Sequence, residues 1–139
     1  MTASGSARTP GRLPCPGVDR DPRRAGADAG DQPGRGDGAA DRDGNTTAAF
    51  VCRPIRGRTT WSAHAYGLAI DVNPFQNPYT SGQRVLPELA TAYLDRGRHL
   101  PGMITADGPV AAAFRSVGWT WGGGWSSPTD LMHFSSTGH

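Results

Sequence analysis

The chain has 139 residues, of which 36% are hydrophobic and 19% charged, and its formal net charge is +2 at pH 7. This length allows one modest domain, and the absence of any apolar run of about 18 residues excludes a membrane-spanning helix. The near-balanced charge makes nucleic acid an unfavourable partner. No N-terminal apolar stretch of roughly 7–15 residues marks a secretory signal, so we expect none in this chain.

The first third of the chain differs in composition from the rest. Residues 1–46 contain 9 of the 20 glycines and 5 of the 12 prolines, whereas every Trp, Phe and Tyr lies after residue 46. A segment with so little apolar surface to bury cannot offset the entropy that it loses on ordering. We therefore predict two parts: residues 1–44, a low-complexity segment that is disordered or comes from a mis-called reading frame, and a folded domain over residues 45–139.

Short elements are predicted at the start of this domain. Apolar runs at residues 48–53 and 68–72 favour strands. Residues 75–87 are rich in Asn, Pro, Gly and Ser and favour a long surface loop, and residues 86–94 favour a short helical turn. Cys52 could pair with Cys15 only by tying the low-complexity segment to the domain, so free thiols are expected.

The clearest helix is predicted from Pro109 to Val117. Proline suits the first helical position, the alanines favour the interior, and the glycine that follows Val117 suits the C-terminal stop. Val110, Phe114 and Val117 share one face at helical spacing. With a Trp/Gly turn at residues 119–125 and a closing strand at 131–134, the expected fold class is α+β, a small antiparallel sheet with flanking helices.

Two histidines and an aspartate occur in surroundings where they need a partner. Asp71 lies between two β-branched residues, and His133 lies within Leu-Met-His-Phe. Burying a carboxylate without a partner costs several kcal/mol. Both residues are explained if His64, Asp71 and His133 bind one metal ion, because two imidazoles and one carboxylate with an open position compose a catalytic zinc site. Hydrogen-bonded structural histidines, with Asp71 capping a turn, are the alternative.

Hydrolysis at such a site needs further groups. Asp130, three residues before His133, is the candidate general base, because ligand and base then share one segment. An ordinary turn residue is the alternative. Arg53 is the candidate cation for a substrate carboxylate or a developing oxyanion, or else a solvated charge.

Three tryptophans lie close together near the C-terminus, namely Trp119, Trp121 and Trp125. Such side chains stack on glycan or peptide ligands, but core packing explains at least two of them equally well. Among them Trp121 is the one that we expect to contact substrate.

Two motifs carry a resemblance to a known family. The segment Ser62–Asp71 reads S-A-H-A-Y-G-L-A-I-D, and the segment Asp130–His133 reads D-L-M-H. They follow S-x-H-x-x-G-x-A-x-D and [D/E]-x-x-H, and together they resemble the zinc peptidases of the D-alanyl-D-alanine carboxypeptidase family. That family includes VanY-like carboxypeptidases and phage L-alanyl-D-glutamate endopeptidases. The likeness runs from about Asn45 to the C-terminus.

The resemblance implies a LAS-type zinc peptidase fold over residues 45–139, incomplete at its N-terminus because residues 1–44 stand where family members have helices. It makes Asp130 the general base, Arg53 the substrate-positioning arginine and Ser62 a hydroxyl that orients the site or binds substrate. The implied zinc ligands are His64, Asp71 and His133.

The implied activity is hydrolysis of peptide bonds in bacterial peptidoglycan stem peptides, as a carboxypeptidase or an endopeptidase, with Zn²⁺ as cofactor. Because the substrate lies outside the membrane, we expect a monomer in the cell envelope or outside the cell. A catalytically impaired cell-wall-binding module on the same fold is the alternative.

Overall fold

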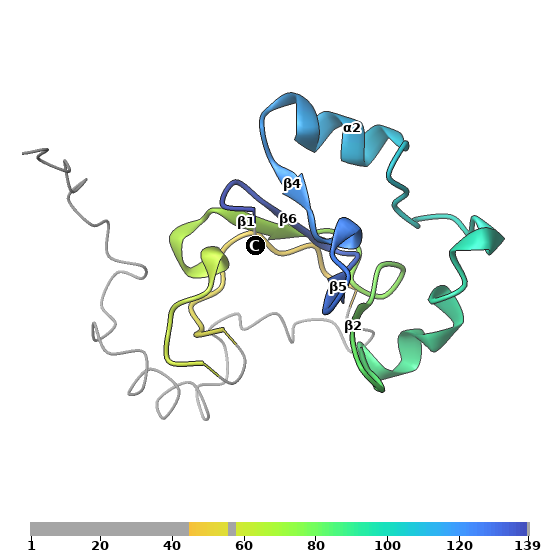
Figure 1. The fold of residues 1–139 in the computed structure, drawn as a ribbon, viewed down its shortest axis with the longest axis horizontal. Coiled ribbons are helices and arrows are strands. Elements are labelled where there is room, and N and C mark those ends of the chain that lie inside the picture. Colours follow the sequence, from red (N-terminus) through yellow and green to blue (C-terminus); the bar gives the residue numbers. More distant parts are fainter. Residues whose placement is uncertain (1–44, 56–57, 139) are drawn as a thin grey trace, which may run out of the picture.

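Short strands and short 3₁₀-helices make up most of the regular secondary structure in residues 45–55 and 58–138, the part of the chain that this computed structural model describes (Figure 1). The low-complexity segment predicted at residues 1–44 lies outside it. Mixed helix and antiparallel sheet confirm the α+β class. In chain order the elements are η1 (Ala63–Tyr66), β1 (Ala69–Asp71), β2 (Tyr79–Ser81), β3 (Arg84–Leu86), η2 (Glu88–Tyr93), η3 (Arg96–Arg98), α2 (Pro109–Ser116), β4 (Thr120–Trp121), η4 (Gly122–Gly124), β5 (Thr129–Asp130) and β6 (His133–Ser135).

The first sheet joins strands from both ends of the domain in the antiparallel order β1-β6-β4 (Figure 1). Its register places Asp71 opposite His133 and Ile70 opposite Phe134. The prediction of a strand at residues 48–53 is wrong. Within that segment only Ala48 pairs with this sheet, through two backbone hydrogen bonds of 2.8 and 2.9 Å with Asp71. The chain then turns away, and the amide of Val51 donates to the carbonyl of His64 instead.

The second sheet has the antiparallel order β3-β2-β5. It contains a hairpin, β2–β3, where the sequence predicted a long loop over residues 75–87, and Gly82 takes a positive φ of +57° in its turn. The aromatic and aliphatic residues Tyr79, Val85 and Leu86 favour strands. The surrounding Asn, Pro and Gly residues favour a loop, and their number led to the loop prediction. The helical turn predicted at residues 86–94 is confirmed as η2.

Helix α2 confirms the helix predicted from Pro109, and Gly118 follows it with a φ of +82°. The helix packs against the first sheet through Ala111 and Phe114, whose ring stacks on Phe134 at a centroid distance of 4.0 Å. The helical spacing predicts Val117 on the same apolar face, but 69% of its surface is exposed, so it does not pack with Phe114 against the sheet. No helix in the described residues is long and apolar enough to cross a membrane.

Two polar side chains organise the long connection between the sheets. Asn77 is fully buried, and its amide group donates to the carbonyls of Val72, Asn73 and Gly102. Its Oδ1 accepts from the amide of Ile104 and from Arg96. This network fixes the chain directly after β1 and directly before β2.

Cys52 corrects the expectation of free thiols. It is disulfide-bonded, and its partner lies outside the described residues. A disulfide needs two sulfur atoms within reach and the right geometry, and it needs no apolar core around either one. The scarcity of apolar residues before residue 46 was therefore not a valid argument against pairing.

Candidate metal and catalytic site

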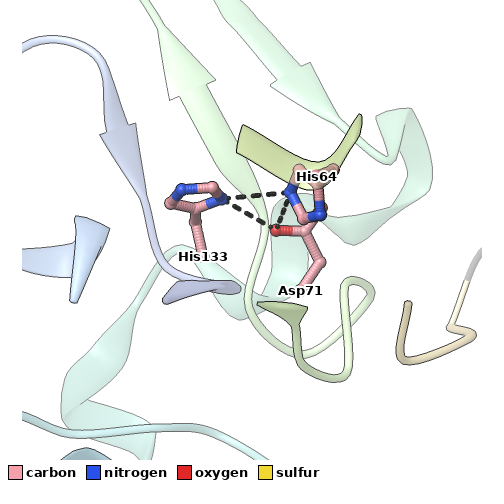
Figure 2. A group of neighbouring side chains, drawn as sticks. All are labelled: His64, Asp71 and His133. Carbon is pink, nitrogen blue, oxygen red and sulfur yellow. Dashed lines mark hydrogen bonds and ion pairs between the residues drawn. The ribbon is translucent and has the colours of Figure 1, made fainter. Parts of the chain in front are cut away.

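Three potential metal ligands converge at the edge of the first sheet. Opposed residues of an antiparallel pair project to the same face, so the Asp71–His133 pair brings a carboxylate and an imidazole together from strands 62 residues apart in the chain. His64 reaches the same point from η1, as Figure 2 shows. The side chains of His64 and His133 are buried, and Asp71 is half-buried.

The sequence around His64 fixes its position. The Ser62 hydroxyl accepts a hydrogen bond of 3.4 Å from the His64 amide and caps the start of η1. Gly67 ends η1 in the left-handed region at φ +69°, which lets the chain turn at once into β1. Nδ1 of His64 lies 3.3 Å from the carbonyl oxygen of Ala49. A carbonyl only accepts, so Nδ1 carries the proton and Nε2 presents a lone pair.

The distances fit a tetrahedral metal ion. His133 Nδ1 lies 3.1 Å from Asp71 Oδ1, and His64 Nε2 lies 3.3 Å from each of those two atoms (Figure 2). With metal–ligand bonds of roughly 2.0–2.1 Å, two corners of a tetrahedron are about 3.3 Å apart. The three atoms are therefore spaced like three corners of a tetrahedral coordination sphere, and the donor set of two nitrogens and one oxygen is one that zinc prefers.

The electrostatics of Asp71 suit an anionic ligand. Burial alone raises the pKa of this carboxyl, but the electrostatic interactions of its Oδ1 with the imidazoles of His133 and His64 outweigh burial. The net effect holds the pKa of Asp71 well below its usual range. Asp71 is therefore ionised at neutral pH, as a metal ligand must be.

Asp130 lies in the second sheet, opposite Tyr79 in β2. Burial raises the pKa of this carboxyl to about 7, and the negative charge of Asp71 adds to the rise. The charges of His133, His64 and Arg53 act in the other direction. Its Oδ1 is buried and has no hydrogen-bond partner in the described part of the chain. A carboxyl that is poorly solvated and titrates near neutrality is suited to accepting and returning a proton.

A cavity of about 790 Å³ connects these groups. Beside the three candidate ligands it is lined by three further residues that the sequence assigned to the site, Asp130, Arg53 and Ser62. Arg53 lies close enough to Asp130 for its charge to lower the pKa of that carboxyl. The volume is within the range of small-ligand sites, about 300–1,000 Å³.

Trp121 is not among the described residues that line this cavity, so the structure gives no support to the expectation that it contacts substrate. Its indole nitrogen donates to the carbonyl of Leu131 at 2.8 Å, and its ring packs on the core. Trp119 packs on the same core, whereas Trp125 lines the cavity with its ring centroid 5.5 Å from that of His133. Two tryptophans thus serve packing and one faces the site.

Several residues that line the cavity were not among the predicted site residues, and two of them lie in the second sheet. Tyr79 and Leu86 line the cavity from the second sheet, and both fall in the segment predicted as loop. The signal that could have found them is the spacing of Tyr79-Thr80 and Val85-Leu86 around a Gly-containing turn, which is typical of a hairpin.

One comparison with known proteins, that with sequence families, supports this arrangement. The sequence family described as D-alanyl-D-alanine carboxypeptidase matches residues 56–136, which is more than half of the chain. The matched range begins before His64 and ends after His133, so it spans both motifs. No curated protein and no solved structure shows significant similarity to the chain.

The family match shows the class of protein to which the chain belongs, which is that of the peptidases. More specifically, the chain belongs to the D-alanyl-D-alanine carboxypeptidase family, whose VanY-like members the two motifs already suggested.

Proposed function

We propose that this protein is a zinc-dependent peptidase, with a LAS-type fold, that hydrolyses a peptide bond in bacterial peptidoglycan stem peptides. The observation that carries the proposal is the triangle of 3.1–3.3 Å formed by His64 Nε2, Asp71 Oδ1 and His133 Nδ1. Two buried imidazole nitrogens and a carboxylate oxygen at tetrahedral spacing are difficult to explain without a shared cation. We assign these three residues as the zinc ligands.

Zn²⁺ at this position would polarise the scissile carbonyl and lower the pKa of a water molecule. The protein must then move one proton. Asp130 takes it from the attacking water as the C–O bond forms, and returns it to the amide nitrogen as the C–N bond breaks. A carboxyl with a pKa near 7 can do both at neutral pH.

The remaining polar groups position the substrate. Among the described residues that line the cavity, Arg53 is the arginine, so we assign it to a carboxylate or developing oxyanion of the peptide. Ser62 supports the site indirectly, because its hydroxyl is used to cap the turn that holds His64. This assignment favours an orienting role for Ser62 over substrate contact.

The stem-peptide substrate also leads us to propose where the protein works. Peptidoglycan lies outside the cytoplasmic membrane, so the proposed site of action is the cell envelope or the medium, with the protein acting as a monomer. A stem pentapeptide ending in D-Ala-D-Ala offers both kinds of bond considered, the terminal D,D-bond and the L-alanyl-D-glutamate bond.

Mass spectrometry tests the proposal and identifies the bond. The zinc-loaded protein is incubated with the stem pentapeptide, and the products are weighed. Loss of one alanine indicates a carboxypeptidase, and cleavage after L-Ala indicates an endopeptidase. Chelation should stop turnover, and stoichiometric zinc should restore it. A folded protein that binds one zinc per chain and cleaves neither bond would contradict the proposal.

A further inference from the structure

The second sheet presents a row of side chains to the cavity. In the order β3-β2-β5, Tyr79 stands opposite Leu86 on one side and opposite Asp130 on the other. Opposed residues of antiparallel strands project to the same face of the sheet. All three residues line the cavity that holds the metal ligands. The candidate base is thus one end of a continuous surface, and Tyr79 is its nearest neighbour across the ladder.

The hydroxyl of Tyr79 has no assigned use within the protein. Tyr79 is half-buried, and its hydroxyl makes no hydrogen bond to any residue that the structure describes. A phenol hydroxyl that is close to a buried surface normally finds a partner. Here it is available to a molecule in the cavity, while the ring of Tyr79 forms part of the wall.

The backbone holds Tyr79 firmly in place. The two residues before it, Asn77 and Pro78, are both fully buried. The side chain of Asn77 joins the chain after β1 to residues 102 and 104, and Arg96 braces it at 2.9 Å. A binding group on a rigid strand loses little freedom when a ligand binds, which favours a specific contact.

We propose that Tyr79 is a substrate-contacting residue, and that its hydroxyl donates a hydrogen bond to a backbone carbonyl of the peptide beside the bond on which Asp130 acts. Peptide carbonyls are acceptors whatever the configuration of the side chains, so this contact suits a substrate of mixed D- and L-residues. Leu86, at the other end of the row, then offers an apolar surface to a small aliphatic side chain. This inference rests on the proposed function.

The test compares two substitutions that each remove one hydroxyl. Tyr79→Phe takes away the proposed donor and keeps the ring. Tyr93→Phe is the matched control, because Tyr93 packs edge-on against Phe75 at 5.6 Å and does not line the cavity. Both zinc-loaded proteins are assayed on the stem pentapeptide, and their zinc content and melting temperature are measured.

We expect Tyr79→Phe to raise KM about tenfold and to change kcat less than about threefold, since the lost hydrogen bond is made in both the bound and the transition state. Tyr93→Phe should match the wild type, and both variants should keep their zinc and melting temperature. Equal KM values for Tyr79→Phe and the wild type would overturn the inference alone, and so would an equal rise in both variants. A wild-type protein that neither binds nor cleaves the peptide would overturn the proposed function, and this inference with it.

Discussion

The polar side chains that face the cavity from the two sheets differ in whether they contact one another, although in the described residues the first sheet also holds a buried atom without a partner, Nε2 of His133. In the first sheet Asp71 and His133 contact each other and His64 at 3.1–3.3 Å. In the second sheet Asp130 has a buried oxygen without a partner, and the hydroxyl of Tyr79 makes no hydrogen bond among the residues described. Metal binding requires lone pairs that are held in convergence, whereas proton transfer and substrate contact require groups that the protein leaves unsatisfied.

The same contrast appears in the two carboxyls of the site. Burial alone would raise the pKa of Asp71, but electrostatic interactions with two imidazoles keep it low. Burial and the charge of Asp71 raise the pKa of Asp130 to about 7. Environments that separate the pKa values of two nearby carboxyls suit them to different roles, here the proposed metal ligand and the proposed base. The following predictions change either the group of candidate metal ligands or the candidate base, one at a time.

The largest effect is expected from Asp71→Asn. The amide cannot supply the negative charge of the ligand set, so we expect zinc affinity to fall at least about 100-fold and peptide hydrolysis to become undetectable. Zinc content after dialysis and turnover of the stem pentapeptide measure both effects. Asp107→Asn is the control, because Asp107 is exposed and does not line the cavity. A variant that keeps stoichiometric zinc would remove Asp71 from the ligand set.

Asp130→Asn changes the candidate base in the second sheet and leaves the candidate metal ligands unchanged. Asparagine keeps the shape of the side chain and cannot accept the proton, so kcat should fall about 10³-fold. Zinc content should stay at the wild-type level, because Asp130 is not one of the three converging ligands. The comparison of turnover and zinc content separates base from ligand. Loss of zinc together with activity would contradict this division.

The same variant should be more stable than the wild type when the metal is removed. The pKa of Asp130 rises from its ordinary value of 3.8 to about 7 in the folded protein, so the folded state binds more protons between these values. Its contribution to stability is present below about pH 4 and is lost as the pH rises toward 7. The loss amounts to at most about 4 kcal/mol, and to less where water reaches the group.

Denaturant unfolding of the metal-free proteins at pH 5 and pH 8 measures this effect. We expect the free energy of unfolding of Asp130→Asn to increase relative to that of the wild type as the pH rises, because asparagine has no charge to bury. Asp71 contributes with the opposite sign and in a different range, because its lowered pKa confines the change to acidic pH. A stability difference that does not depend on pH between 5 and 8 would show that Asp130 titrates normally.

Local signals in the sequence indicated the first sheet, and the proximity of His64, Asp71 and His133, better than they indicated the second sheet. His64 and Asp71 are separated by one tight turn, and that turn needs Gly67 at positive φ, so a short motif specifies their geometry. The helix from Pro109 was equally local, since its start and stop residues are adjacent to it in the chain. Both features depend on neighbours in sequence, which a single sequence contains.

The second sheet depends on contacts between distant residues. Tyr79 is paired with Asp130, 51 positions away, and nothing in either segment alone indicates the other. The same holds for Trp121 and Trp125, because which ring faces the cavity depends on where Phe134 packs. Sequence patterns identify apolar and aromatic residues, but tertiary packing decides which of them face a ligand.

The smallest effect that we predict concerns the turn between the ligands His64 and Asp71. At Gly67 a Cβ atom would meet only Phe50, at 4.0 Å, so Gly67→Ala has room for its methyl group. Its φ of +69° remains unfavourable for alanine, and we expect a loss of about 1 kcal/mol in the free energy of unfolding. Gly124→Ala is the matched control, because Gly124 lies in open space without a positive φ and leads to the cavity residue Trp125.

Denaturant unfolding of the zinc-free variants gives both values, and zinc titration shows whether the turn also positions His64. If the turn only connects η1 to β1, Gly67→Ala loses stability and keeps the zinc affinity of the wild type. We expect a fewfold loss of zinc affinity in addition, because the Gly67 amide donates to the His64 carbonyl at 3.1 Å and strain at Gly67 therefore acts on a ligand. Gly124→Ala should change neither quantity by more than about 0.5 kcal/mol. Equal stabilities of the two variants would show that the left-handed conformation of Gly67, between His64 and Asp71, does not contribute to stability as we expect.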